Sequence, residues 1–149
     1  MKNIVIVDID GTISKVGDRI KYLKQNPVDW DSFYDSCFED EPIEEICRLV
    51  MSLYRIGYNI VYCTGRRESV RYKTNKWLFD NLLPLPTTET LLMRPNGDRR
   101  HDTEVKPELI TNAGIKLDDI AFVLEDRDSM VKKWRKMGLK CLQVAEGDF

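Results

Sequence analysis

The stretch NIVIVDIDGT at residues 3–12 decides the fold of this chain. Residues 4–7 are an uninterrupted run of Ile and Val, which is typical of a strand that is buried on both faces of a parallel sheet. The second half of the stretch places two carboxylates, Asp8 and Asp10, directly after the strand, and Gly11 permits a tight turn there. The stretch therefore predicts a buried strand with acidic side chains at its carboxyl end.

The rest of the chain alternates short apolar segments with amphipathic helical patterns. Residues 58–63, 91–93, 120–124 and 140–144 are predicted strands, and residues 43–53, 68–83, 105–112 and 130–137 are predicted helices. Such alternation favours right-handed crossovers between parallel strands. We expect an α/β fold: a single Rossmann-like parallel sheet of about five strands with helices on both faces, in one domain over residues 1–149.

One connection, residues 13–41, is much longer than the others. Loops of compact domains rarely exceed about 12 to 15 residues unless they have a function. Trp30, Phe33, Tyr34 and Phe38 supply apolar anchors within it. We expect a small, partly helical cap or lid over the strand ends. The alternative is a packing arm that has no gating role.

Composition argues against several other classes of protein. Hydrophobic residues make up 42% and charged residues 32% of the sequence, as in an ordinary globular protein. The net charge of −2 argues against a protein that coats nucleic acid through bulk electrostatics. His101 is the only histidine, so a histidine-based catalytic triad lacks support. The four cysteines form no C-x-x-C pair, and we expect reduced core thiols.

The sequence gives no sign of a membrane segment or a leader. No apolar run approaches the roughly 20 residues that a membrane-spanning helix needs. The first predicted strand begins at residue 3 and leaves no room for a signal peptide, so we expect a cytoplasmic protein without a membrane partner.

Although the net charge is slightly negative, basic residues are concentrated in the middle of the chain, where they are compatible with a local anion site: Arg66, Arg67, Arg71, Lys73, Lys76, Arg94, Arg99, Arg100 and Lys106.

Chemically useful residues follow the predicted strands. Thr64-Gly65-Arg66 comes after the second strand, Glu125-Asp126-Arg127 after the fourth, and Lys106 lies at the start of the helix after the third. Carboxyl ends of parallel strands meet at one edge, so we expect these groups near Asp8 and Asp10. Neighbouring carboxylates repel, and a bound cation is the simplest way to keep them charged. A hydroxyl, a flexible backbone and a guanidinium are suited to holding a phosphate.

With these motifs the sequence resembles the haloacid dehalogenase superfamily. Its signature of D-x-D-G-T, T-G-R, a lysine and an acidic pair is matched at residues 8–12, residues 64–66, Lys106 and Glu125-Asp126. The resemblance implies that Asp8 attacks phosphorus to form an aspartyl-phosphate, while Asp10 protonates the leaving oxygen and then activates water. Mg²⁺ would be held by Asp8, the Asp10 main-chain carbonyl and Asp126. Glu125 stands where the superfamily often has Asp, so its contact is direct or through water.

The same resemblance implies that Thr64, the backbone at Gly65 and Lys106 fix phosphoryl oxygens and that Arg66 reaches a substrate oxygen. A narrower similarity, to the phosphatase domain of the phage polynucleotide kinase/phosphatase family, implies removal of a 3'-phosphate from DNA or RNA ends. Arg67, Arg94 and Arg99 would then lie beside a neighbouring phosphodiester. The residues that carry this similarity are Trp77-Leu78, Arg94, Asp98-Arg99, Asp102, Val105-Lys106, Glu125-Asp126-Arg127, Trp134-Arg135 and the run QVAEGDF at residues 143–149.

The sequence leaves alternatives to this function. No G-x-x-x-x-G-K-[ST] motif occurs, so a kinase half is not expected in this sequence, and a separate kinase or ligase partner stays open. The main alternative is a phosphatase for mononucleotides or other small phosphates, with the aromatic lid stacking on one base. A non-enzymatic phospho-accepting receiver is a distant alternative, because its acceptor aspartate ends the third strand, which here ends Met93-Arg94.

Overall fold

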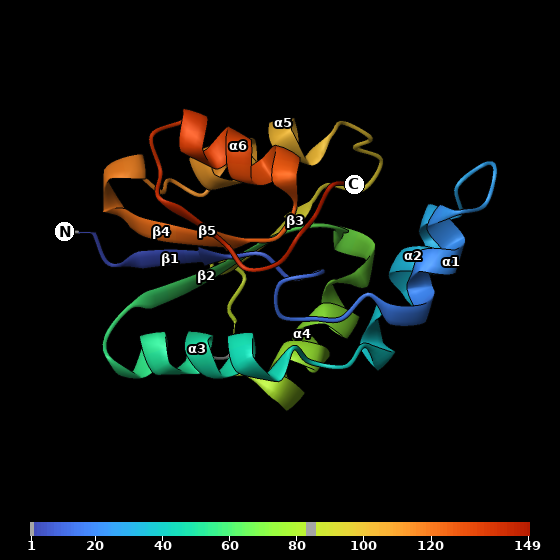
Figure 1. Ribbon diagram of the computed structural model, residues 1–149, viewed down its shortest axis with the longest axis horizontal. Helices are drawn as coiled ribbons and strands as arrows, with labels where there is room; N and C mark the ends of the chain where they lie inside the picture. Colours follow the sequence, from blue (N-terminus) through green and yellow to red (C-terminus); the bar gives the residue numbers. More distant parts are fainter. Residues whose placement is uncertain (1, 83–85) are drawn as a thin grey trace.

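The computed structural model describes residues 2–82 and 86–149, and within them the chain forms a five-stranded parallel sheet (Figure 1). The strand order is β3-β2-β1-β4-β5. The strands are β1 (Ile4–Val7), β2 (Asn59–Arg67), β3 (Leu91–Arg94), β4 (Ile120–Glu125) and β5 (Cys141–Gln143). The predicted fold class is therefore confirmed.

The first strand is the centre of the sheet. β1 pairs with β2 on one side and with β4 on the other. The chain builds outward through β2 to β3, then crosses to β4 and β5, so the strand order reverses beside β1. Ligands of such sheets bind beyond the carboxyl ends of the strands at this reversal. Asp8 follows β1 directly and lies at that point.

Helices cover both faces of the sheet. α3 (Glu44–Arg55) and α4 (Arg71–Asn81) lie on one face, and α5 (Asp102–Asn112) and α6 (Asp128–Lys136) lie on the other (Figure 1). Among the described residues, no helix is long and apolar enough to cross a membrane. A short 3-10 helix, η4 (Leu117–Asp119), leads into β4.

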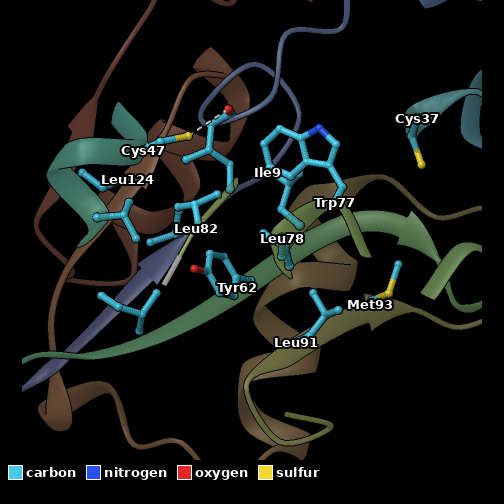
Figure 2. Close-up of a cluster of buried hydrophobic side chains, with 14 of the residues drawn as sticks. Ile9, Cys37, Cys47, Tyr62, Trp77, Leu78, Leu82, Leu91, Met93 and Leu124 are labelled. Atoms are coloured by element: carbon cyan, nitrogen blue, oxygen red, sulfur yellow. Dashed lines mark hydrogen bonds between the residues drawn. The ribbon is translucent and has the colours of Figure 1, made fainter. Parts of the chain in front are cut away.

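Burial on both faces explains the continuous apolar run of β1. Val5 and Val7 belong to the core under α3 and α4, whereas Ile6 belongs to the core under α5 and α6. Ile9 extends the first core beyond the strand and packs with Trp77 and Leu78 (Figure 2). The cysteines are free and buried, as expected for core thiols: Cys37, Cys47, Cys63 and Cys141.

Some predicted boundaries were wrong. Thr64, Gly65 and Arg66 lie inside β2 and not after it, because β2 continues to Arg67 with a register irregularity between Thr64 and Arg67. α5 begins at Asp102, so Lys106 lies in the second turn of the helix and not at its start.

The helix predicted over 68–83 is shorter and begins later. A 3-10 helix, η3 (Glu68–Val70), precedes α4, which ends at Asn81 because Leu82 is extended. Residue 83 of that prediction lies outside the described residues.

Residues 13–41, hereafter the insertion, lie beside the carboxyl ends of the strands near α4 (Figure 1). Its elements are η1 (Gly17–Arg19), α1 (Ile20–Leu23), α2 (Trp30–Asp35) and η2 (Cys37–Glu39). Phe33, Tyr34 and Cys37 are buried in the same core as β1 and α4. Its two ends are joined by the hydrogen bond from Lys15 N to Glu41 O, 2.8 Å. The insertion is therefore partly helical and anchored, and its motion stays a prediction.

Candidate active site

Three carboxylates and one ammonium meet beside the ends of β1 and β4. Asp8 Oδ1 accepts a hydrogen bond from Lys106 Nζ at 2.8 Å, and the same ammonium donates to Glu125 Oε2 at 2.9 Å. Oxygens of Asp8, Glu125 and Asp126 lie within 4.8 Å of one another, and all three residues are buried. We call these three residues the acidic centre.

The acidic centre carries more negative charge than its surroundings compensate. Burial, together with the charge of Asp8, raises the pKa of Glu125 and of Asp126 above their ordinary values. Burial opposes the charge of Lys106, yet the carboxylates around it, Asp8 first, raise its pKa and keep it protonated. When all three carboxylates are ionised, they and the one ammonium leave two negative charges, which one divalent cation would balance. Clustered carboxylate oxygens are the donors that Mg²⁺ prefers, so the residues present fit this ion.

The turn after β1 fits tightly against the acidic centre. Gly11 has a φ of +84°, and a Cβ there would lie 2.1 Å from Asp126 Oδ2. Thr12 Oγ1 donates to Asp8 Oδ2 at 2.9 Å and lies 3.3 Å from Asp126 Oδ1. The glycine therefore provides both the backbone conformation and the space that Asp126 occupies.

Asp10 lies outside the acidic centre and belongs to a second buried network. Its Oδ1 is 2.7 Å from Arg19 Nη2 of the insertion and 2.7 Å from Arg66 Nη2. Asp40 Oδ2 contacts the same two groups, at 2.6 Å from Arg19 and 3.4 Å from Arg66. Burial opposes ionisation of Asp10, but the guanidinium groups of Arg66 and Arg19 hold its pKa below the ordinary value. The Asp10 carboxylate is bound to these guanidinium groups, and the predicted metal ligand of this residue stays its main-chain carbonyl.

Arg66 makes contacts within the protein that the sequence did not predict. Its side chain has no exposed surface, and its Nη1 donates to Thr74 Oγ1 at 3.2 Å. In this arrangement the guanidinium binds Asp10. The Arg66 main-chain N–H donates to Thr64 Oγ1 at 3.1 Å, which orients the threonine hydroxyl.

A third set of contacts surrounds Gly65. Its carbonyl accepts from Arg94 Nε at 2.9 Å and from Tyr34 Oη at 3.2 Å. Arg94 is buried and also pairs with Asp102, whose other oxygen is 3.0 Å from Arg127 Nη1. A Cβ at Gly65 would lie 2.5 Å from Asp102 Oδ1, so a side chain there would displace the Asp102 carboxylate from its contacts.

The other predicted substrate ligands differ in exposure. The side chain of Arg67 is 22% exposed and pairs with Asp31 at 2.7 Å. Arg99 is exposed on the loop between β3 and α5.

Sequence reasoning missed the roles of Arg19 and Asp40. Both lie in the insertion, where no periodic pattern indicates which charged side chains turn inward. Asp102 was noted only as part of a family pattern, although its position at the start of α5 brings it beside Gly65. The sequence signal for this network is the length of the insertion, because such a long connection usually has a function.

The sheet and the acidic centre define a phosphatase fold of the haloacid dehalogenase type, and comparison with known proteins agrees. The chain belongs to the polynucleotide kinase PNKP phosphatase domain family, whose model matches residues 2–149.

Solved structures share this fold. A chain in a Pnkp1/Rnl/Hen1 complex has a TM-score of 0.80 and 28% identity, over 97% of this chain and 46% of that one. A chain in the Pnkp1/Rnl/Hen1 RNA repair complex has the same score and identity, over 97% and 43%. This chain thus spans less than half the length of either. The class C acid phosphatase from Bacillus anthracis with tungstate bound has a TM-score of 0.69 and 17% identity, over 100% and 69%, which shows the fold alone.

We predict that Gly11→Ala lowers turnover of p-nitrophenyl phosphate on the order of 100-fold, because the new Cβ displaces the Asp126 carboxylate. Gly114 is a matched control, since it has a φ of +74° and a Cβ there meets nothing within 4 Å. Gly114→Ala should cost about 1–2 kcal/mol of unfolding free energy while turnover stays at the wild-type level. Equal losses of turnover in both variants would contradict this account.

Proposed function

We propose that this protein is a magnesium-dependent phosphomonoesterase that carries the phosphoryl group on Asp8 and removes the 3'-phosphate from polynucleotide ends. The observation that carries the proposal is the environment of Asp8: a buried carboxylate, held by Lys106 and Thr12, inside the acidic centre of a chain from this family. Its two oxygens have different partners, so the side chain is fixed in one orientation. A fixed anionic oxygen is the requirement for an in-line attack on phosphorus.

The reaction would proceed in two halves. An Asp8 oxygen forms a bond to phosphorus as the ester bond breaks, and the leaving oxygen takes a proton from Asp10. Asp10 then accepts a proton from the water that attacks the aspartyl-phosphate, which releases inorganic phosphate and restores Asp8. Arg19 and Arg66 favour the ionised form of Asp10 that the second half needs. Because Arg19 belongs to the insertion, loosening its contact with Asp10 would favour the protonated form that the first half needs.

Mg²⁺ would be held by Asp8, Asp126 and the Asp10 main-chain carbonyl, with Glu125 in contact directly or through water. When bound, it supplies the positive charge that lets an anionic nucleophile meet an anionic ester. Lys106 and Thr64 would bind the remaining phosphoryl oxygens, which places a fixed positive charge where negative charge gathers in the transition state.

Three findings support a polynucleotide substrate. Family membership points to this class, and one similar structure comes from a complex described as an RNA repair complex. Arg67 and Arg99 keep exposed surface, as contacts to a neighbouring phosphodiester require. Arg94 would act by holding Gly65 and Asp102 in place. A separate kinase or ligase would be a suitable partner. Membership of a phosphatase family argues against the alternative of a phospho-accepting receiver.

We predict that Asp8→Asn lowers the turnover of p-nitrophenyl phosphate by at least about 1,000-fold, because the amide is a poor nucleophile. Circular dichroism should show an unchanged fold. Asp118→Asn applies the same chemical change to an exposed aspartate in η4 and should turn over like the wild type. Near-normal turnover by Asp8→Asn would show that another residue is the nucleophile.

We predict that dialysis against a chelator abolishes turnover and that Mg²⁺ restores it. Mg²⁺ should also raise the thermal midpoint of the wild-type protein, because a cation that binds only the folded state stabilises it. Asp126→Asn removes one carboxylate of the acidic centre and should weaken this stabilisation. Full turnover in the presence of chelator would exclude the metal-dependent mechanism.

We predict that a 3'-phosphorylated oligonucleotide is hydrolysed with a higher kcat/KM than a 3'-mononucleotide, and the mononucleotide with a higher value than a sugar phosphate. Phosphate release from all three substrates is measured under the same metal and salt conditions. Equal or faster turnover of the sugar phosphate would favour the small-phosphate alternative.

A further inference from the structure

An aromatic patch, defined here as Trp30, Tyr34 and Arg67, lies where the insertion meets the end of β2. The rings of Trp30 and Tyr34 are stacked, with centroids 6.0 Å apart and an interplanar angle of 22°. The Arg67 guanidinium carbon lies 5.3 Å from the centroid of Tyr34. Phe33 meets Trp30 edge-on at 86°. Tyr34 is buried, whereas Trp30 remains 44% exposed, so the stack begins in the core and ends at the surface.

The patch is connected directly to the candidate active site. Tyr34 Oη donates to the carbonyl of Gly65, the residue between Thr64 and Arg66. Burial, followed by the charges of Asp102 and Asp10, raises the pKa of Tyr34, which places its hydroxyl within the electrostatic field of both carboxylates. The ring of Tyr34 therefore connects Trp30 to the residues that surround the site.

The charge beside the patch suits a phosphodiester. Arg67 is paired with Asp31, whose side chain is 87% exposed, and ion pairs of this kind contribute little to stability. The guanidinium is therefore free to exchange Asp31 for a phosphate at small cost. A second cation lies beside an aromatic ring of the insertion: Lys73 Nζ of α4 is 5.4 Å from the centroid of Phe38. Alternating aromatic and basic groups are the usual means of binding single-stranded nucleic acid.

We propose that Trp30 is a stacking platform for the nucleobase next to the phosphate that occupies the candidate active site, with Arg67 on the adjacent phosphodiester. This inference rests on the proposed function and deepens it. Tyr34 covers one face of the indole, so a base that approaches from solvent continues an existing stack. Stacking requires an unpaired base, and the preferred substrate is therefore a single-stranded or frayed 3' end, with little dependence on base identity.

The test compares two oligonucleotides that carry the same 3'-phosphate, one with a terminal base and one with an abasic terminal sugar. The wild-type protein should prefer the base-bearing substrate in kcat/KM by about 10-fold, as expected for one stacked base. Trp30→Ala should reduce this preference to nearly 1, and Trp30→Phe should restore part of it. Tyr54→Ala is the matched control and should keep the full preference, because Tyr54 is an aromatic residue with 45% exposure on the far end of α3.

A binding measurement separates this inference from the proposed function. The other two tryptophans, Trp77 and Trp134, are buried, so quenching of tryptophan fluorescence by a single-stranded oligonucleotide should come from Trp30. Trp30→Phe should lose most of the quenching, and an abasic terminus should lower it in the wild type. If quenching persists in Trp30→Phe, or if Trp30→Ala keeps the preference for a terminal base, the stacking inference is overturned. If quenching requires Trp30 but no phosphate is released from the oligonucleotide, the proposed function alone fails.

Discussion

The site depends on one constraint: three buried carboxylates lie close together, and the ammonium of Lys106 pairs with two of them, Asp8 and Glu125. Parallel pairing of β1 with β4 brings Asp8 beside the acidic pair at residues 125–126, and α5 delivers Lys106 between Asp8 and Glu125. Unpaired buried charges are costly, and removing one partner of a buried ion pair typically costs about 3–5 kcal/mol. Lys106 compensates only part of the charge of the ionised carboxylates, so the acidic centre is suited to a cation at the carboxyl edge of the sheet.

A second buried network links the insertion to the same edge. Arg19 and Asp40 come from opposite ends of the insertion, yet both meet beside Asp10 and Arg66. The indole of Trp77 adds a hydrogen bond to the Asp40 carbonyl at 2.7 Å, which ties the end of the insertion to α4. Displacing the insertion as a whole would leave buried charges unpaired. We therefore expect any opening of the site to occur by small movements around Arg19, while the rest of the insertion stays in place. This behaviour is intermediate between the moving lid and the static packing arm that the sequence left as alternatives.

The parts of this site that the sequence predicts are those that strand topology controls. Asp8, Lys106 and the acidic pair converge because each lies near the carboxyl edge of one parallel sheet, and the apolar runs were enough to infer that sheet. The direction of a long side chain is a different matter. Arg66 lies near that edge, but its guanidinium points toward Asp10 and Asp40. Asp40 comes from the folded insertion, so the sequence could not show that this partner would be there. Inward charges of an irregular segment leave no periodic trace, so Arg19 could not be singled out.

The two glycines of the signature motifs show that backbone conformation explains only part of why a glycine stands at each position. Gly65 reads in the sequence as a source of backbone flexibility, yet its φ is not positive, and it lies within a strand. What excludes a side chain there is the carboxylate of Asp102, as Asp126 does at Gly11. Each glycine lies against a carboxylate from another element, so the motif records the close approach of an acid that is distant in sequence. A glycine at a strand tip in this fold is therefore evidence about its acidic neighbour as much as about the turn.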